Sequence, residues 1–338
     1  MVDVDRLERN LRRWQAECDR LGFANRPHIK THRSIEVARR QIELGAVGLT
    51  CQKLGEAETM VDAGFEDVLV PYNLVGPRKL ERLAALLRRA TIRVSFDDQA
   101  LLPGLASAAE AAGRELGVLV DCDTGLGRTG VTEPERAVEL AVAAGQTDSL
   151  RFEGFATYPA PEESLTFFAE ATRLCELEGL EVGTVSVGGT PSMWDAERMR
   201  PTATEYRAGT YAFNDRNTVS AGAATLDDVA LTVRATVVSR PASDRAVLDA
   251  GSKALASDVG HDGGFGLVLE APESRIARLD EEHAYVSLAP GDSLELGQTV
   301  SVVPNHACVV SNLFDAFTVV HDGEPVARWR VDARGRSD

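Results

Sequence analysis

Short apolar segments alternate with longer amphipathic segments through the first two thirds of the chain. The short segments are rich in β-branched residues, which favour strands, and the longer ones repeat apolar residues every three or four positions, as helices with one buried face do. Eight strands that alternate with helices predict parallel βα units. The best fit is a (β/α)8 barrel, with a doubly wound open sheet as the competing fold. The predicted strands are Pro27–Lys30, Val47–Gln52, Val68–Tyr72, Ile92–Phe96, Gly117–Cys122, Phe152–Tyr158, Thr184–Gly188 and Tyr206–Phe213, and the predicted helices include Ile35–Leu44, Lys79–Arg89, Pro134–Ala144 and Leu165–Glu178.

The pattern changes near Val229, after which strand-like segments follow one another closely. Turns such as Asp322-Gly323 separate them, and turns of this kind join antiparallel strands. The sequence therefore predicts two domains, a barrel over residues 1–225 and a mainly antiparallel β domain over residues 226–338. The predicted strands of the second domain are Val229–Arg240, Arg245–Asp249, Ala284–Leu288, Thr299–Val303, Ala316–His321 and Ala327–Val331.

Composition and charge exclude several classes of partner. The chain has 338 residues, 44% of them apolar, and a formal net charge of −16. An acidic surface repels phosphate backbones, so we expect no nucleic-acid partner. The chain has no run of about 18 uncharged apolar residues, and its first residues do not resemble a signal peptide, so we expect a cytoplasmic protein with no membrane partner. The five cysteines form no CxxC pair, which argues against a disulfide framework.

The segment Arg26-Pro-His-Ile-Lys-Thr-His-Arg-Ser34 places a lysine at the end of the first predicted strand. Barrel enzymes carry catalytic groups at this end of their strands. Lys30 lies between His28 and His32, and partial loss of water there would favour a neutral, nucleophilic amine. The sequence therefore predicts that Lys30 forms a Schiff base with a carbonyl cofactor. The alternative is a surface lysine on a basic loop.

Two glycine-rich loops follow later strands. In Asp121-Cys-Asp-Thr-Gly-Leu-Gly-Arg-Thr-Gly130, the glycines let the backbone bring Arg128 over the mouth of the barrel. In Ser186-Val-Gly-Gly-Thr-Pro-Ser192, small residues let backbone N–H groups approach a phosphate. Barrel phosphate sites commonly lie after strands seven and eight, which is where this second loop is predicted. The alternative in both cases is a turn without a ligand.

The segment Pro304-Asn-His-Ala-Cys308 lies in the predicted β domain. In a strand, residues two apart point to the same face, so we expect His306 and Cys308 to project together. An imidazole with a thiolate is a ligand pair that suits Zn²⁺. The alternative is a buried cysteine beside a hydrogen-bonded histidine.

These four motifs, in this order, resemble the D-threonine aldolase and D-serine dehydratase family of fold-type-III pyridoxal enzymes. That family joins an alanine-racemase-like barrel to a β domain that carries a divalent metal. The resemblance runs from about Val4 to Asp332 and includes the stretches Cys51–Ala57, Ala208–Phe213 and Asp249–Lys253. It implies a lyase that uses pyridoxal 5'-phosphate and a divalent metal on β-hydroxy D-amino acids. It also implies a homodimer.

The resemblance implies a role for each motif. Lys30 would carry the cofactor, and Arg128 would lie beside the cofactor's ring oxygen. His306 and Cys308 would hold the metal, zinc or else manganese or magnesium. The remaining residues implied at the cofactor pocket are Gly188, Gly189, Thr190 and Tyr211 for the phosphate, and Gln52 and Tyr158 for its lining, with His28 and Tyr158 joining Lys30 as catalytic groups.

The sequence leaves the reaction open. His-x-Cys resembles the dehydratase branch, whereas the aldolase branch tends toward His-x-Asp, and members that look like this chain overall are commonly grouped with the aldolases. Family aldolases carry a histidine after the tyrosine at position 158, where this chain has Pro159. Metal-bound water, His28 or His32 would then have to replace that histidine. We expect retro-aldol cleavage to glycine and an aldehyde, with β-elimination from D-serine or 3-hydroxy-D-aspartate, an amino-acid racemase and a non-catalytic carrier of the cofactor as the alternatives.

Overall fold

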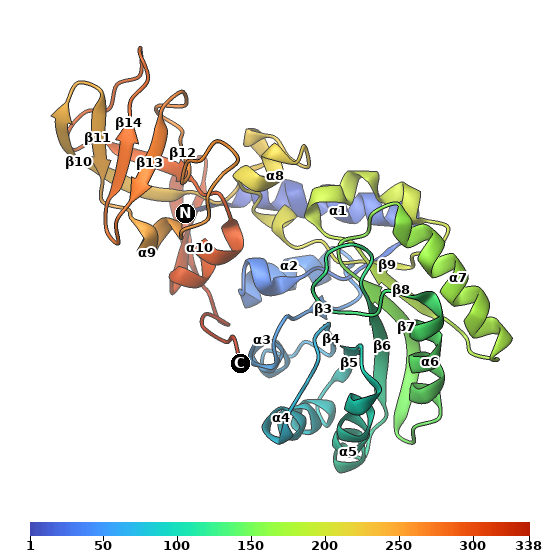
Figure 1. The fold of residues 1–338 in the computed structure, drawn as a ribbon. Helices are drawn as coiled ribbons and strands as arrows, with labels where there is room; N and C mark the ends of the chain where they lie inside the picture. The colour runs from blue at the N-terminus through green and yellow to red at the C-terminus, as the bar shows by residue number, and fades with distance from the viewer. The chain divides into compact units, whose positions relative to one another are not determined.

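The computed structural model describes all residues, 1–338, as two compact units that are interleaved along the chain (Figure 1). The barrel unit comprises residues 14–30, 38–209 and 335–338. The β unit comprises residues 1–13, 31–37 and 210–334. Each unit is built by its own sheets. No helix is both long enough and apolar enough to cross a membrane.

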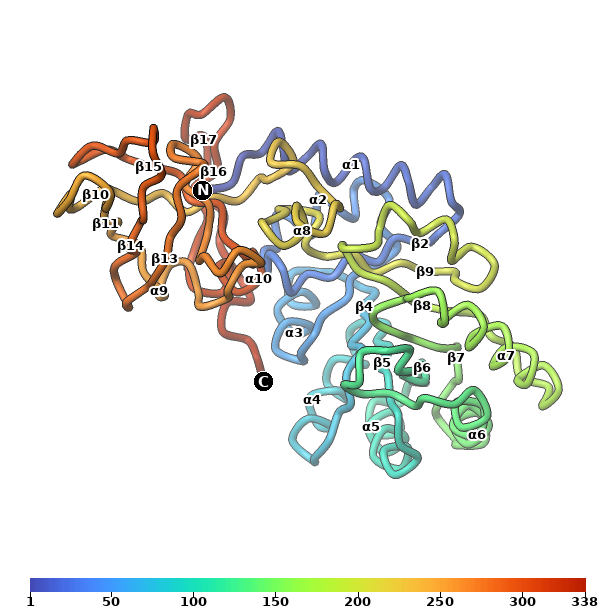
Figure 2. The backbone as a smooth tube through the Cα atoms, turned by 45° about the horizontal axis from the view of Figure 1, so that its top comes forward, coloured from blue at the N-terminus to red at the C-terminus, as the bar shows by residue number.

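The barrel unit is built on an eight-stranded parallel sheet with the order β2-β9-β8-β7-β6-β5-β4-β3. A parallel bridge between His28 and Thr50 joins its two outer strands, and the Thr50 N–H donates to the Pro27 carbonyl at 2.9 Å. The sheet therefore closes into a barrel, with the helices on its outside (Figures 1 and 2). The strands are β2 (Ala24–Asn25), β3 (Leu49–Thr50), β4 (Asp67–Val70), β5 (Thr91–Phe96), β6 (Leu116–Cys122), β7 (Leu150–Thr157), β8 (Thr184–Val187) and β9 (Glu205–Tyr206).

The barrel helices begin and bury residues as their sequences predict. Pro77 and Pro134 stand at the starts of α4 and α6, positions where proline loses no helical hydrogen bond. The α4 helix buries Leu83 and Leu87 on one face. The helices and 3-10 turns along this part of the chain are α1 (Val4–Leu21), η1 (Ile29–Thr31), α2 (Ile35–Glu43), α3 (Leu54–Asp62), α4 (Pro77–Leu87), η2 (Gln99–Leu101), α5 (Leu102–Ala112), α6 (Pro134–Gly145), α7 (Glu163–Leu177) and η3 (Thr190–Met199).

A network of ion pairs links the barrel strands near their amino ends. Arg26 pairs with Glu205 at 2.5 Å and with Asp67 at 2.5 Å. Arg93 pairs with the same Asp67 at 2.6 Å and with Glu153 at 2.5 Å. Because Arg26, Glu153 and Glu205 are buried, removing one partner would leave a buried charge, at a cost of about 3–5 kcal/mol. The network joins β4, β5, β7 and β9 at the end of the barrel opposite to the one that enzymes of this fold use for chemistry.

The β unit contains two sheets. One is a six-stranded antiparallel sheet with the order β12-β15-β10-β11-β14-β13. In the other, the first strand of the chain, β1, pairs in parallel with β16, which pairs with β17. The strands are β1 (Val2–Asp3), β10 (Val233–Ala242), β11 (Arg245–Leu248), β12 (Leu267–Val268), β13 (Arg275–Leu279), β14 (Ala284–Ser287), β15 (Thr299–Val303), β16 (Ala316–His321) and β17 (Glu324–Arg330), and the helical segments are η4 (Thr210–Ala212), α8 (Arg216–Ser220), η5 (Leu226–Asp228), α9 (Ser252–Leu255) and α10 (Ala307–Leu313).

The predicted fold class, a (β/α)8 barrel followed by a mainly antiparallel β domain, is confirmed. The first predicted strand, Pro27–Lys30, is wrong: β2 ends at Asn25, and Lys30 lies in the turn η1. Proline has no backbone N–H to donate, and the chain after it makes only the single bridge at His28. Because residues 1–13 and 31–37 belong to the β unit, no single cut separates the two units. The division at 225/226 stays a prediction.

Candidate functional site

Most of the predicted site residues of the barrel unit follow the carboxyl ends of its strands. Parallel strands of a barrel end on the same face, and active sites of this fold are built there. The structure therefore gathers residues that are widely separated in the sequence. They are Lys30 after β2, Gln52 after β3, Arg128 after β6, Tyr158 after β7 and Gly188, Gly189 and Thr190 after β8.

The ring of Tyr158 is the point where several of these residues meet. The Lys30 Nζ atom lies 5.9 Å from the ring centroid, and the Arg128 Cζ atom lies 5.8 Å from it. A Cβ atom on Gly189 would come within 2.5 Å of the same ring. Two cations and a loop of the predicted phosphate site therefore surround one aromatic side chain. The structure brings together these four predicted residues.

The loop after β8 fits closely against Tyr206. Gly188 has a φ of +82°, and a Cβ atom there would lie 2.2 Å from the Tyr206 ring. The Tyr206 hydroxyl donates to the Gly189 carbonyl at 3.1 Å. The Thr190 hydroxyl accepts from the Gly209 N–H at 3.3 Å. The turn therefore requires glycine at 188 and has a fixed backbone.

His28 and Gln52 form a pair beside Lys30. The His28 Nε2 atom lies 3.1 Å from Gln52 Oε1, and the Lys30 N–H donates to His28 Nδ1 over a long 3.5 Å. An amide oxygen only accepts, so the arrangement fits a neutral ring with its proton on Nε2. Both ring nitrogens are then engaged, which orients His28 and leaves neither nitrogen idle. Its role as a base stays a prediction.

The two histidines considered as substitutes for the missing aldolase histidine are both buried. His32 belongs to the β unit, is 0% exposed and packs edge-on against Phe213 at 6.3 Å. Its Nδ1 atom accepts from the Ser34 N–H at 3.1 Å. These contacts place His32 in a packed core. Pro159 follows Tyr158 through a cis peptide bond.

Arg207 is a site residue that sequence reasoning missed. It stands directly after β9 and is 6% exposed. Its Nη2 atom donates to the Thr157 carbonyl at 2.7 Å, but its buried Nη1 atom has no hydrogen-bond partner. Burial lowers the pKa of Arg207 and raises the pKa of the neighbouring Asp121. Buried donors without a partner are rare, so the free N–H fits an acceptor on a bound group. A charged residue immediately after a barrel strand was the available signal.

The His306 and Cys308 pair lies in the β unit. The expectation that a strand carries this pair is wrong: His306 is the residue before α10, and Cys308 lies in the first turn of that helix. The two side chains still meet, because a hydrogen bond with Cys308 is the main cause that raises the pKa of His306 to about 9. The Thr31 hydroxyl lies 3.2 Å from the Cys308 sulfur, and the Thr210 hydroxyl lies 3.7 Å from it.

Asp215 holds the start of α10 in place beside this pair. It is 0% exposed and caps α8 by accepting from the Thr218 N–H at 2.8 Å. Its other oxygen accepts from the Ala307 N–H at 2.9 Å and lies 3.6 Å from His306 Nδ1. A carboxylate on one ring nitrogen commonly orients a histidine that uses the other nitrogen as a metal ligand. The donor set therefore fits a metal ion.

Tyr211, the remaining predicted residue, also belongs to the β unit. It is buried in η4, and its carbonyl accepts from the Asn214 side chain at 3.1 Å. Its role at the phosphate stays a prediction.

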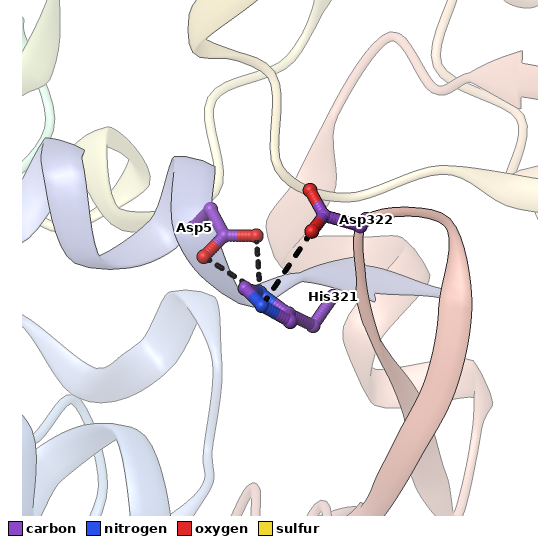
Figure 3. A group of neighbouring side chains, drawn as sticks. All are labelled: Asp5, His321 and Asp322. Carbon is purple, nitrogen blue, oxygen red and sulfur yellow. Dashed lines mark hydrogen bonds and ion pairs between the residues drawn. The ribbon is translucent and has the colours of Figure 1, made fainter.

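A second group of metal-ligating side chains lies on the surface of the β unit. Figure 3 shows His321 between Asp5 and Asp322, with dashed contacts to both. The Nδ1 atom lies 2.7 Å from Asp5, and Nε2 lies 3.7 Å from Asp322. Because the carboxylates approach opposite nitrogens of an exposed ring, the group is best described as an ion-paired histidine that links the starts of α1 and the β16–β17 turn.

The sequence matches two family descriptions. Residues 2–217 match the alanine racemase N-terminal domain, and residues 230–320 match the putative serine dehydratase domain. A D-threonine aldolase of Arthrobacter sp is 34% identical over 100% of this chain and 92% of its own length. A 3-hydroxy-D-aspartate aldolase of Paracoccus denitrificans (strain Pd 1222) is 33% identical over 99% of this chain and 91% of its own length.

Solved structures agree with these matches. The crystal structure of a D-threonine aldolase from Filomicrobium marinum superposes with a TM-score of 0.92 at 34% identity, and covers 100% of this chain and 95% of that one. A D-threo-3-hydroxyaspartate dehydratase from Delftia sp. HT23 gives a TM-score of 0.87 at 30% identity, over 97% and 95% of the two chains. Similarity to an alanine racemase of Streptomyces lavendulae, at 19% identity and a TM-score of 0.71, shows the fold alone.

The relatives cover the barrel, the β unit and nearly their own full lengths, and their names describe aldol cleavage and dehydration of D-amino acids. The chain therefore belongs to the family of pyridoxal-phosphate-dependent lyases that includes the D-threonine aldolases, the 3-hydroxy-D-aspartate aldolases and the D-threo-3-hydroxyaspartate dehydratases.

Proposed function

We propose that the protein is a pyridoxal-phosphate- and divalent-metal-dependent lyase that cleaves β-hydroxy D-amino acids to glycine and an aldehyde. The observation that carries the proposal is the grouping of Lys30, Arg128 and Gly189 around the ring of Tyr158. An amine, a cation and a tight glycine loop are the parts that a carbonyl cofactor with a phosphate requires. The relatives with aldolase names support the same reaction.

The buried groups of the barrel unit fit the cofactor. Lys30 would carry it, and the backbone of Gly188, Gly189 and Thr190 would hold its phosphate. The unpartnered Nη1 atom of Arg207 would donate to an acceptor on the cofactor ring. Asp121, whose pKa is raised by burial, lies close enough to contribute to the field at Arg207 and Arg128.

The chemistry divides between the bound groups and the side chains. Pyridoxal phosphate supplies an electron sink for charge that develops at Cα, and a divalent cation lowers the pKa of a neighbouring hydroxyl. Lys30 binds the cofactor and moves a proton at the substrate Cα. Tyr158 and Arg128 limit where the Lys30 amine can lie. His306 and Cys308 would hold the cation, and Asp215 would keep the His306 ring turned toward it.

Dehydration is the second candidate reaction, because this chain carries Cys308 where a dehydratase-like pair has a thiolate. Solved forms of the Delftia dehydratase include a cysteine-to-alanine variant described as metal-free. In β-elimination, the metal would stabilise departing hydroxide, and Lys30 would remove the Cα proton. The same residues therefore serve either reaction, and the products decide between them.

Incubation of the purified protein with pyridoxal phosphate and zinc, manganese or magnesium tests the proposal. Glycine with acetaldehyde from D-threonine identifies an aldolase, and pyruvate with ammonia from D-serine identifies a dehydratase. Release of neither set of products from D-threonine, D-serine or 3-hydroxy-D-aspartate would refute the lyase assignment. A visible absorption band that borohydride removes, and that Lys30→Ala lacks, reports the lysine independently of turnover.

The metal and the homodimer have their own tests. Cys308→Ala is expected to abolish stoichiometric zinc binding in metal analysis, whereas the buried Cys175→Ala serves as a control that keeps it. The homodimer implied by the family would appear as twice the chain mass in light scattering at micromolar concentration. A fully active monomer would contradict it.

A further inference from the structure

The chain uses lysine sparingly. Only four of its 36 basic residues are lysines, and the rest are arginines. Lys30, Lys53 and Lys79 follow three successive barrel strands in the chain, β2, β3 and β4. The fourth, Lys253, lies in the β unit and pairs with Glu281 and Glu282 on the surface. In a chain with a net charge of −16, three ammonium groups at one end of the barrel are a local positive feature.

Lys53 and Tyr72 are in direct contact. The Lys53 Nζ atom lies 3.8 Å from the centroid of the Tyr72 ring. The pKa of Tyr72 is lowered, mainly by a hydrogen bond from Lys53, and then by the charges of Lys79 and Arg128. All three groups that lower it are cations, so the potential at the phenol is positive. Arg128 is the same guanidinium that lies beside Tyr158 and Lys30.

One carboxylate fixes the two loops that carry Tyr72 and Arg128. Asp97 follows β5 and accepts from the Asn73 side chain at 2.6 Å. Its other oxygen accepts from the Gly130 N–H at 2.9 Å. The nearest acidic group is therefore occupied by two N–H donors, and it holds the neighbouring loops in fixed positions. The lysines and the phenol are left as the groups that can meet an anion.

We propose that Lys53 and Tyr72, with Lys79 behind them, form a subsite for an anionic group carried on the β-carbon of the substrate. This inference rests on the proposed lyase function and refines it. The substrate class becomes β-hydroxy D-amino acids with a second carboxylate, such as 3-hydroxy-D-aspartate. Lys53 donates to the carboxylate, and the Tyr72 hydroxyl adds a second donor, as paired charged and neutral donors do in anion sites.

Kinetics of the loaded enzyme test the subsite. We expect Lys53→Met to lower the ratio of kcat/KM for 3-hydroxy-D-aspartate to that for D-threonine on the order of tenfold to a hundredfold, as loss of a charged hydrogen bond does. The loss should appear in KM rather than kcat. Lys53→Arg should keep most of the preference. Lys253→Met, which removes the surface lysine, should leave the ratio at the wild-type value, and circular dichroism checks that each variant is folded.

Binding without turnover separates this inference from the proposed function. Dissociation constants for D-aspartate and D-alanine are read from the absorbance of the bound cofactor. Weaker binding of D-aspartate alone in Lys53→Met supports the subsite, even if no substrate is cleaved and the lyase proposal fails. Equal ratios in the wild type and Lys53→Met, in both binding and kinetics, would overturn the subsite, while cleavage of D-threonine would leave the lyase proposal intact.

Discussion

Replacing Gly188 by alanine tests how tightly the loop after β8 is built. A residue other than glycine in the left-handed region costs about 1–2 kcal/mol, and Gly188 has a φ of +82°. The new Cβ atom would also lie 2.2 Å from the Tyr206 ring. That ring is 1% exposed and packs edge-on against Trp14 at 5.0 Å, so it has little room to move. Overpacking of this kind costs about 1–3 kcal/mol. We therefore expect Gly188→Ala to lower the free energy of unfolding by about 2–5 kcal/mol.

Gly179→Ala separates the two causes. Gly179 has a similar φ of +72°, but nothing lies within 4 Å of a Cβ built there. The control should therefore lose only the backbone part, about 1–2 kcal/mol. Guanidinium unfolding followed by tryptophan fluorescence measures both variants, since Trp14 and Trp194 report on the barrel unit. The close fit of Gly188 against Tyr206 would be refuted if both variants lost the same free energy within about 0.5 kcal/mol.

Further changes test the other contacts. Asp215→Asn replaces a buried double acceptor and should lower the free energy of unfolding by about 1–3 kcal/mol and zinc affinity roughly 10–100-fold; the same change at the exposed cap Asp98 should alter neither, and equal losses would contradict the role of the buried carboxylate. Arg207→Met should leave the cofactor-free protein as stable as the wild type or more stable, because it removes a buried charge, and should weaken pyridoxal-phosphate binding; unchanged affinity in a cofactor titration would count against this role. The pKa of His321 is raised, mainly by its hydrogen bond to Asp5, so this pair stabilises the fold below the ordinary histidine pKa of about 6.5 and ceases to as pH rises through the raised value. His321→Gln should therefore lower the melting temperature more at pH 6 than at pH 9, and an equal effect at both pH values would rule this out.

The barrel and the order of its motifs could be predicted because both depend on local pattern. Each buried parallel strand is an apolar run, and each motif follows such a run. The grouping around Tyr158 then follows from topology, since parallel strands end on one face. Strands of two residues such as β12 carry no periodic signal, and they form only because β15 is already in place to pair with them.

Other features depend on contacts that no local pattern encodes. The Cys308-Val-Val segment has the β-branched residues of a strand, yet it folds as the start of α10. The Asp215 side chain, from far earlier in the chain, accepts from the Ala307 N–H and stabilises the first turn of that helix. The unpartnered N–H of Arg207 is likewise a property of the packed barrel. In sequence it is one arginine among many.

The parallel pairing of β1 with β16 has a consequence for biosynthesis. Val2 pairs with Val319, so the first strand to leave the ribosome waits for nearly the whole chain. At roughly 5–20 residues per second, that delay is on the order of 15–60 s. During it, the apolar side chains of Leu7 and Leu11, which end fully buried, have no β unit to cover them. The nascent amino-terminal helix is therefore a natural client for chaperones. A fusion partner attached to Met1 would stand beside one of the last contacts of the fold to form.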